Sequence, residues 1–376
     1  MMQMVHSRFN ALLSACVLSL IATAGWSQSL TWLGTLGGCC SSAHGVSDNG
    51  VVVGWATNAA GRARAFRWEN GVMQDLGTLA GYEESYALDV SADGRVVVGY
   101  IRNIPARWRA IRWENGVMQD LGTLGGSNSK ALGVSADGRV VVGVADNGGG
   151  QYRPVRWTAS GGIQDLGDLG GGNGEAWGVS ADGAVVVGWA DPIPRVGAYP
   201  FRWTASRGMR ALVYDWGRAF GVSADGSVVV GYSSGGAFRW TAAGGMQYLG
   251  MPSGYISNYA YAVSADGSVV VCTAEYAAGQ GRAFRWTVGG GMENLNTTYA
   301  SLLTNGSELR EARAISPNGR YIVGVGYNAA TERTEAFLLD TTGRPPCTLD
   351  GDLNGDRVVD DADLLILLFN FGNRCP

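Results

Sequence analysis

One pattern of apolar and polar residues recurs along most of the chain. In each copy an apolar stretch ends in a serine, a short turn of the Asp-Gly type follows, and a run of β-branched residues comes next, as in residues 90–99. Aspartate and glycine tolerate the backbone conformations of a tight turn, so the pattern predicts a β-hairpin. The serine occurs at seven positions, 41 to 52 residues apart: Ser47, Ser91, Ser135, Ser180, Ser223, Ser264 and Ser316.

The rest of each repeat predicts two further strands. Residues 65–68 read Ala-Phe-Arg-Trp, and residues 237–240 repeat the phrase. Phe66 and Trp68 share one face because side chains alternate along a strand, which leaves Arg67 on the other face. A fourth strand is expected at 71–77 and, in the next repeat, at 116–122.

The two ends of the chain complement each other. Residues 31–38 look like an isolated fourth strand, and the last repeat ends after its third strand at 336–340. Pairing them would remove an open sheet edge, and repeats of about 44 residues that form four strands are typical of propeller blades. The sequence therefore predicts an all-β, seven-bladed β-propeller over residues 25–343, closed by the N-terminal strand, with a small calcium-loop and helix module after it.

Composition and charge limit the classes of partner that the chain is expected to bind. Of the 376 residues, 46% are hydrophobic and 16% are charged, which indicates a globular chain with a large core. The net charge is −4 and Lys130 is the only lysine, so we expect no nucleic-acid partner. No apolar run after the first 24 residues is long enough for a membrane span.

The arginines recur in register with the repeats. Burial of a guanidinium favours bidentate pairing with a carboxylate, so we expect partners such as Asp75, Asp120 and Asp165, with a ring-shaped anion site as the alternative. The arginines concerned are Arg67, Arg112, Arg156, Arg202, Arg239 and Arg285.

The N-terminus predicts export. Residues 1–24 carry His6 and Arg8, an apolar run, and small residues at Ala22 and Ala24, the order of a signal peptide cleaved after Ala24. The expected location is extracellular or at the cell surface, with the periplasm as the alternative.

Five cysteines follow the predicted signal peptide, and disulfides persist in exported proteins. Cys347 and Cys375 bracket the C-terminal module and are the expected disulfide. The pairing of Cys39, Cys40 and Cys272 stays open.

The C-terminal module, 344–376, carries the spacing of a calcium loop. Positions 1, 3, 5, 9 and 12 hold acidic or amide side chains, and position 7 offers a backbone carbonyl. Hard oxygen ligands in this register predict Ca²⁺ as the bound ion, and a solvated acidic turn is the alternative. The ligands are Asp352, Asn354, Asp356, Val358, Asp360 and Asp363.

Two family resemblances rest on these phrases. Residues 65–81 and 131–143 resemble the HAF family of bacterial extracellular repeats, which implies export and a propeller-like array over about residues 30–340, but no established chemistry. Residues 351–372 resemble one type I dockerin repeat, which implies calcium binding and a cohesin-like or cell-surface partner. The tail departs from dockerins by having one repeat where they carry two, and Arg357 at position 6 where they have glycine.

The sequence offers few candidate catalytic residues. His44 is the only histidine after the signal peptide, so a Ser-His-Asp arrangement has one candidate base. The turn aspartates, Asp93 among them, recur in the repeats and are expected to serve the turn.

Aromatic residues just beyond the second strand of the repeats are the stronger candidates for a binding site. They are expected on one propeller face, where they could stack on sugar rings, with packing between blades as the alternative. These residues are Trp55, Tyr100, Trp189, Tyr232 and Tyr327. The sequence thus predicts a secreted, non-enzymatic binding or surface protein for an unidentified extracellular ligand, with a glycan as one candidate. The alternative is a polysaccharide-active hydrolase or lyase that uses carboxylates on the propeller face.

Overall fold

The computed structural model describes residues 28–103, 107–192, 197–277 and 280–342, and residues Ser29–Asp340 form one compact unit. The predicted signal peptide at 1–24 lies outside the described residues. So do the predicted calcium ligands at 352–363 and both Cys347 and Cys375.

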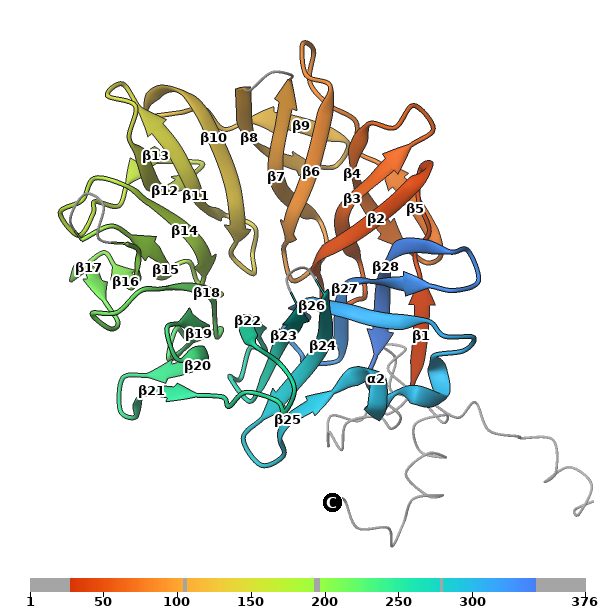
Figure 1. Ribbon diagram of the computed structural model, residues 1–376. Helices are drawn as coiled ribbons and strands as arrows, with labels where there is room; N and C mark the ends of the chain where they lie inside the picture. Colours follow the sequence, from red (N-terminus) through yellow and green to blue (C-terminus); the bar gives the residue numbers. More distant parts are fainter. Residues whose placement is uncertain (1–27, 104–106, 193–196, 278–279, 343–376) are drawn as a thin grey trace, which may run out of the picture. The chain divides into compact units, whose positions relative to one another are not determined.

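The described unit is built almost entirely of four-stranded antiparallel sheets, each contributed by one repeat. Within the unit the sheets surround a common centre, the arrangement of a β-propeller (Figure 1). The first three repeats form β2(Gly37–Val46), β3(Val52–Asn58), β4(Ala63–Glu69), β5(Val72–Asp75), β6(Glu84–Val90), β7(Val96–Asn103), β8(Arg107–Glu114), β9(Val117–Asp120), β10(Gly125–Val134), β11(Val140–Asn147), β12(Tyr152–Thr158) and β13(Gly162–Asp165). The next three form β14(Gly174–Val179), β15(Val185–Ala190), β16(Tyr199–Thr204), β17(Gly208–Ala211), β18(Gly217–Val222), β19(Val228–Ser233), β20(Gly236–Thr241), β21(Gly245–Tyr248), β22(Ser257–Val263), β23(Val269–Ala277), β24(Gln280–Thr287) and β25(Gly291–Asn294).

The last repeat differs from the others. A short helix α2(Leu295–Thr298) and a 3₁₀ turn η1(Ala300–Leu302) lead to β26(Glu308–Ile315), β27(Tyr321–Asn328) and β28(Arg333–Asp340). The fourth strand of this sheet is β1(Ser29–Trp32), which pairs antiparallel with β28 and places Trp32 opposite Phe337. The predicted closure by an N-terminal strand is therefore confirmed.

The closing strand is shorter than the predicted 31–38. Gly34 and Gly37 adopt φ values of 74° and 96°, which interrupt the extended chain, and Gly37 already begins β2. One parallel bridge, Cys40 to Thr334, joins this sheet to that of β2–β5, so the two together form an eight-stranded sheet.

The repeated serine organises the hairpin turn. Ser91 is buried, its Oγ donates to Asp93 Oδ1 at 2.6 Å, and it accepts from the N–H of Val96 at 3.0 Å. Gly94 adopts a φ of 74°, which a β-carbon would strain. The expected turn role of the repeated aspartates is confirmed by the same contact in other repeats, as at Ser223 and Asp225.

Backbone hydrogen bonds link each turn to the next around the centre. The N–H of Ala92 donates to the carbonyl of Ala136 at 3.1 Å, and the equivalent bonds continue through the following repeats. Pro317 occupies this position in the last repeat and has no N–H to donate. There the N–H of Asn318 donates instead to Asp48 Oδ1 at 2.7 Å, so a carboxylate makes the final link.

Three of the repeated arginines pair with carboxylates as predicted, but the partners are Glu69, Glu114 and Glu293 and not the named aspartates. Arg67 bonds to Glu69 at 2.8 Å and reaches the turn carbonyl of Gly94 in the next repeat at 3.2 Å. Asp120 pairs instead with Arg109. The reason is register: Asp120 lies opposite Ile111, so side-chain alternation puts it on the face of Arg109 and not on that of the repeated arginine, Arg112.

Candidate functional site

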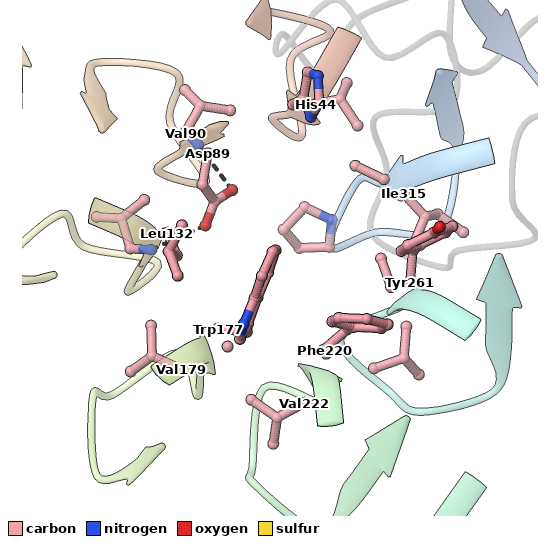
Figure 2. A pocket seen from close by; sticks show the side chains of 18 of the residues that line it. His44, Asp89, Val90, Leu132, Trp177, Val179, Phe220, Val222, Tyr261 and Ile315 are labelled. Atoms are coloured by element: carbon pink, nitrogen blue, oxygen red, sulfur yellow. Dashed lines mark hydrogen bonds between the residues drawn. The ribbon is translucent and has the colours of Figure 1, made fainter. Parts of the chain in front are cut away.

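A cavity of about 490 Å³ lies in a channel at the centre of the propeller (Figure 2). The innermost strand of each repeat contributes the residue three positions before the repeated serine. These seven equivalent residues are His44, Leu88, Leu132, Trp177, Phe220, Tyr261 and Arg313. The side chain at this position differs between repeats while the strand around it is kept. The fold therefore does not require a particular residue there.

One side of the channel is aromatic. The rings of Trp177 and Phe220 have centroids 5.2 Å apart and meet edge to face, and Phe220 and Tyr261 are 5.4 Å apart. His44 and Asp89 lie on the opposite side (Figure 2). Arg218 and Arg313 also line the cavity, so the channel combines flat apolar surfaces with polar and cationic groups.

Among the described residues that line the channel, His44 is the one with an imidazole. Its Nε2 lies 3.2 Å from the hydroxyl of Ser42. Burial, together with the positive charge of Arg313, lowers the pKa of His44 to about 3. A base this weak is poorly matched to proton abstraction near neutral pH, so the contact with Ser42 is a hydrogen bond between neutral groups.

Asp89 is a carboxylate that sequence reasoning missed. It replaces the glycine or alanine that other repeats carry two positions before the serine, such as Gly133. Its Oδ1 accepts from the N–H of Val90 at 2.8 Å, and its Oδ2 accepts from Val134 of the next repeat at 2.9 Å. Burial raises the pKa of Asp89 to about 6. The sequence did contain a signal for it, because Asp89 is a charged residue at a position where the other repeats have glycine or alanine.

The predicted face aromatics do not line the channel, and four of them contact the neighbouring repeat. Four of them occupy equivalent register positions on the second strand: Trp55, Tyr100, Trp189 and Tyr232. Trp55 meets Tyr86 at 6.1 Å, and Tyr232 meets Tyr259 at 4.9 Å. These contacts are those expected of packing between blades.

Tyr327 does not share their position. It pairs with Glu308, whereas Val325 is the residue opposite Glu311, the equivalent of Ser42. Tyr327 is two residues farther along its strand, where Arg310 lies over its ring at 5.1 Å.

The three described cysteines are free thiols: Cys39 is exposed, Cys40 is partly buried and Cys272 is buried. The Sγ atoms of Cys39 and Cys40 lie 2.7 Å apart. Within the described ranges, no group of three or more His, Cys, Asp or Glu side chains is placed to hold a metal ion. None of the helices in that part of the chain is both long and apolar enough to cross a membrane.

Comparison with known proteins gives the fold alone. No family model matches the chain, and no curated protein matches it significantly. A puromycin-hydrolyzing peptidase from Mycobacterium tuberculosis is similar in structure with a TM-score of 0.55 and 17% identity, over 85% of this chain and 52% of that one. A prolyl endopeptidase superposes with a TM-score of 0.53 and 12% identity, over 89% of this chain and 55% of the other. TolB from Acinetobacter baumannii gives a TM-score of 0.47 and 14% identity, over 74% and 76%.

The chain spans about half the length of these two peptidases. At such low identity the likeness shows a shared β-propeller architecture and carries no activity to this chain.

Proposed function

We propose that this chain is an exported, non-enzymatic binding protein whose central channel receives an extracellular ligand. The supporting observation is the ring of equivalent channel positions, where side chains differ while the scaffold around them repeats. On one side of the ring Trp177, Phe220 and Tyr261 form an aromatic wall. The cavity volume of about 490 Å³ is within the range of small-molecule sites.

The polar groups of the channel favour binding over catalysis. His44 is a weak base, and both carboxylate oxygens of Asp89 accept backbone N–H groups. A glycoside hydrolase, the alternative, needs two carboxylates on either side of a scissile bond. Among the described residues that line the channel, Asp89 is the one carboxylate.

A seven-bladed ring belongs to the same proposal. Five four-stranded sheets, together with an eight-stranded sheet held by a single parallel bridge in its middle, support this number of blades. The link between Asp48 and Asn318 supports closure between the first and last repeats.

The tail is proposed to bind one Ca²⁺ through residues 352–363 and to dock or anchor the protein at a cohesin-like or cell-surface partner. The oxygen-ligand spacing supports the ion. The likeness to HAF repeats and to a dockerin repeat supports export and docking.

The test uses variants that the repeats themselves suggest. Phe220→Leu and Trp177→Leu place in the channel the residue that two other repeats carry there, so the backbone should accept both. Trp55→Val is the control, because Val144 occupies the equivalent position in the third repeat. The wild type and variants are applied to a glycan array and to a panel of aromatic and aliphatic fragments, with and without calcium, and hits are quantified by calorimetry.

We expect a channel ligand to lose about tenfold in affinity or more in the Leu variants, because aromatic contacts and their buried area are removed. Trp55→Val should bind as the wild type does. Loss confined to Trp55→Val would move the site to the outer aromatics, and cleaved glycan products would favour the enzymatic alternative.

A further inference from the structure

A second cavity lies where the third repeat meets its neighbours. Its volume is about 220 Å³. The third repeat supplies Lys130 and Asp146 from β10 and β11, β8 supplies Trp108, and the fourth repeat supplies Glu175 and Trp189. The cavity thus combines charged groups with two indole rings.

Asp146 lines this cavity, and one of its two carboxylate oxygens has no hydrogen-bond partner among the described residues. Its side chain is 7% exposed, and Oδ2 accepts from Asn128 Nδ2 at 2.8 Å. Oδ1 is buried and has no hydrogen-bond partner among the described residues. A buried carboxylate oxygen without a partner is costly, so a ligand that supplies an O–H or N–H donor would be stabilised here.

Lys130 supplies the complementary donor. Its Nζ lies 4.4 Å from the ring centroid of Trp108 and 5.1 Å from that of Tyr100. Burial lowers the pKa of Lys130, and the nearby carboxylate of Glu175 opposes this shift. The ring faces position the ammonium but leave its N–H groups available to a hydrogen-bond acceptor on a ligand.

The indole of Trp189 is held in a fixed orientation. Its Nε1 donates to Glu175 Oε2 at 3.0 Å, and the guanidinium of Arg218 lies over its ring at 5.0 Å. Trp177 of the channel donates to the same Glu175 oxygen at 2.9 Å. Glu175 therefore has two indole donors and its position is constrained.

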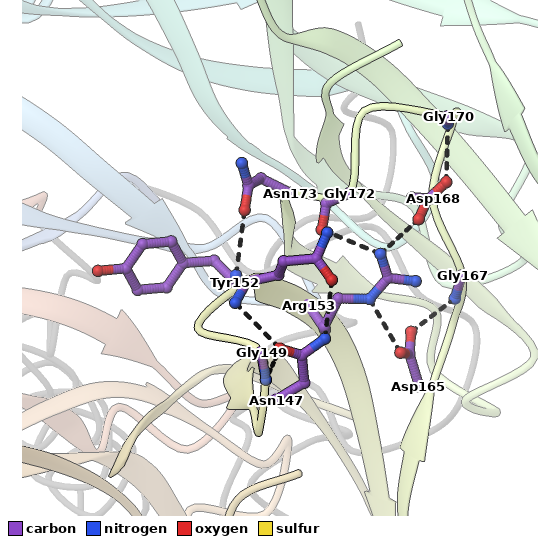
Figure 3. Close-up of polar contacts among 11 residues, drawn as sticks. Asn147, Gly149, Tyr152, Arg153, Asp165, Gly167, Asp168, Gly170, Gly172 and Asn173 are labelled. Carbon is purple, nitrogen blue, oxygen red and sulfur yellow. Dashed lines mark hydrogen bonds and ion pairs between the residues drawn. The ribbon is translucent and has the colours of Figure 1, made fainter. Parts of the chain in front are cut away.

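The neighbouring loops are also held by polar contacts (Figure 3). Arg153 is 9% exposed and bonds to Asp165 at 2.9 Å, to Asp168, and to the carbonyl of Gly172 at 2.9 Å. The adjacent N–H of Tyr152, whose side chain lines the cavity, donates to Asn173 Oδ1 at 3.2 Å. A cavity whose walls are fixed before binding loses less entropy when a ligand enters.

We propose that this cavity binds one pyranose ring of a neutral saccharide. One ring hydroxyl donates to Asp146 Oδ1, a neighbouring hydroxyl accepts from Lys130 Nζ, and the C–H face of the sugar packs on an indole. A hydroxyl group both donates and accepts, which suits a carboxylate acceptor and an ammonium donor together. An anion would meet the carboxylates of Asp146 and Glu175, and a cation would meet Lys130, so a neutral ligand fits best. This proposal does not rest on a ligand in the channel, although Trp177 of the channel contacts Glu175 of this cavity.

The single lysine makes the test direct. Full-length protein is produced with ¹³C,¹⁵N-lysine, so that Lys130 gives one side-chain signal in NMR spectra. The probes are the methyl pyranosides of glucose, galactose, mannose and N-acetylglucosamine, with methylammonium and acetate as ionic comparisons. At least one pyranoside should shift the Lys130 signal in a saturable way.

Asp146→Asn keeps the shape of the side chain and removes its charge. It should weaken the best pyranoside by about tenfold or more, the range expected for a hydrogen bond to a charged group. Asp191→Asn is the matched control, since Asp191 occupies the equivalent sequence position in the next repeat, directly after β15, and does not line the cavity. Its affinity should equal that of the wild type, and thermal unfolding confirms that both variants fold.

Three results would overturn the proposal. The first is the absence of a Lys130 shift with every pyranoside up to its solubility. The second is an equal loss of affinity in Asp146→Asn and Asp191→Asn. The third is saturable binding of methylammonium or acetate that is tighter than that of any sugar.

Discussion

Replacement of His44 by leucine should remove a specific acid sensitivity of the fold. Burial lowers the pKa of this imidazole from 6.5 to about 3, so the folded state disfavours its protonation. Below pH 6.5 the unfolded chain binds the proton and the folded chain does not. The contribution of His44 to the unfolding free energy is therefore fully present above pH 6.5 and is lost as the pH falls toward 3.

The magnitude follows from the two pKa values. Each pH unit inside that window is worth about 1.4 kcal/mol, so acidification from pH 7 to pH 5 should cost the wild type about 2 kcal/mol through this group. The variant His44→Leu should not show this loss. Leu88 and Leu132 occupy the equivalent channel position in the next two repeats, so the backbone is expected to accommodate the substitution.

Urea denaturation followed by tryptophan fluorescence at both pH values measures the effect. The quantity of interest is the difference in unfolding free energy between variant and wild type, which should shift by about 2 kcal/mol in favour of the variant at pH 5. In parallel, the His44 imidazole signal in NMR should not titrate between pH 7 and pH 5. The reasoning would be refuted if the difference in unfolding free energy between variant and wild type did not change with pH, or if the imidazole titrated near pH 6.5. Either result would show that channel water solvates His44.

Three further predictions concern other parts of the chain. The raised pKa of Asp89 makes the folded wild type bind a proton below about pH 6, which stabilises it on acidification. Asp89→Gly lacks this gain, so between pH 7 and pH 5 its unfolding free energy should fall by about 1 kcal/mol relative to that of the wild type. The same urea titrations measure this difference. Ser91→Ala should cost about 1 to 3 kcal/mol in chemical denaturation, because the buried N–H of Val96 loses its acceptor. Calorimetric titration should detect one Ca²⁺ per chain, lost when Asp352 and Asp363 are both changed to alanine, while the unfolding of the propeller stays unchanged; no heat of binding in the unmutated protein at millimolar calcium would contradict this.

The sequence by itself determined the features that depend on neighbouring residues. The alternation of side chains in 65–68 placed Phe66 and Trp68 on one face, and both are buried. The Ser-x-Asp-Gly phrase specified the hairpin turns, because its hydrogen bonds join residues only a few positions apart. The unmatched strands at the two ends predicted the closure that β1 and β28 make.

Only the tertiary structure decided the contacts between repeats. Residues of neighbouring repeats that are 27 to 45 positions apart meet because each sheet is placed beside the next, and no local pattern encodes that placement. This is why Arg67 reaches Gly94 and why Asp89 binds Val134. For the same reason the cavity around Lys130 combines side chains from three successive repeats. Strand propensity and turn chemistry act over a few residues, whereas a binding site in a closed ring depends on how whole sheets pack.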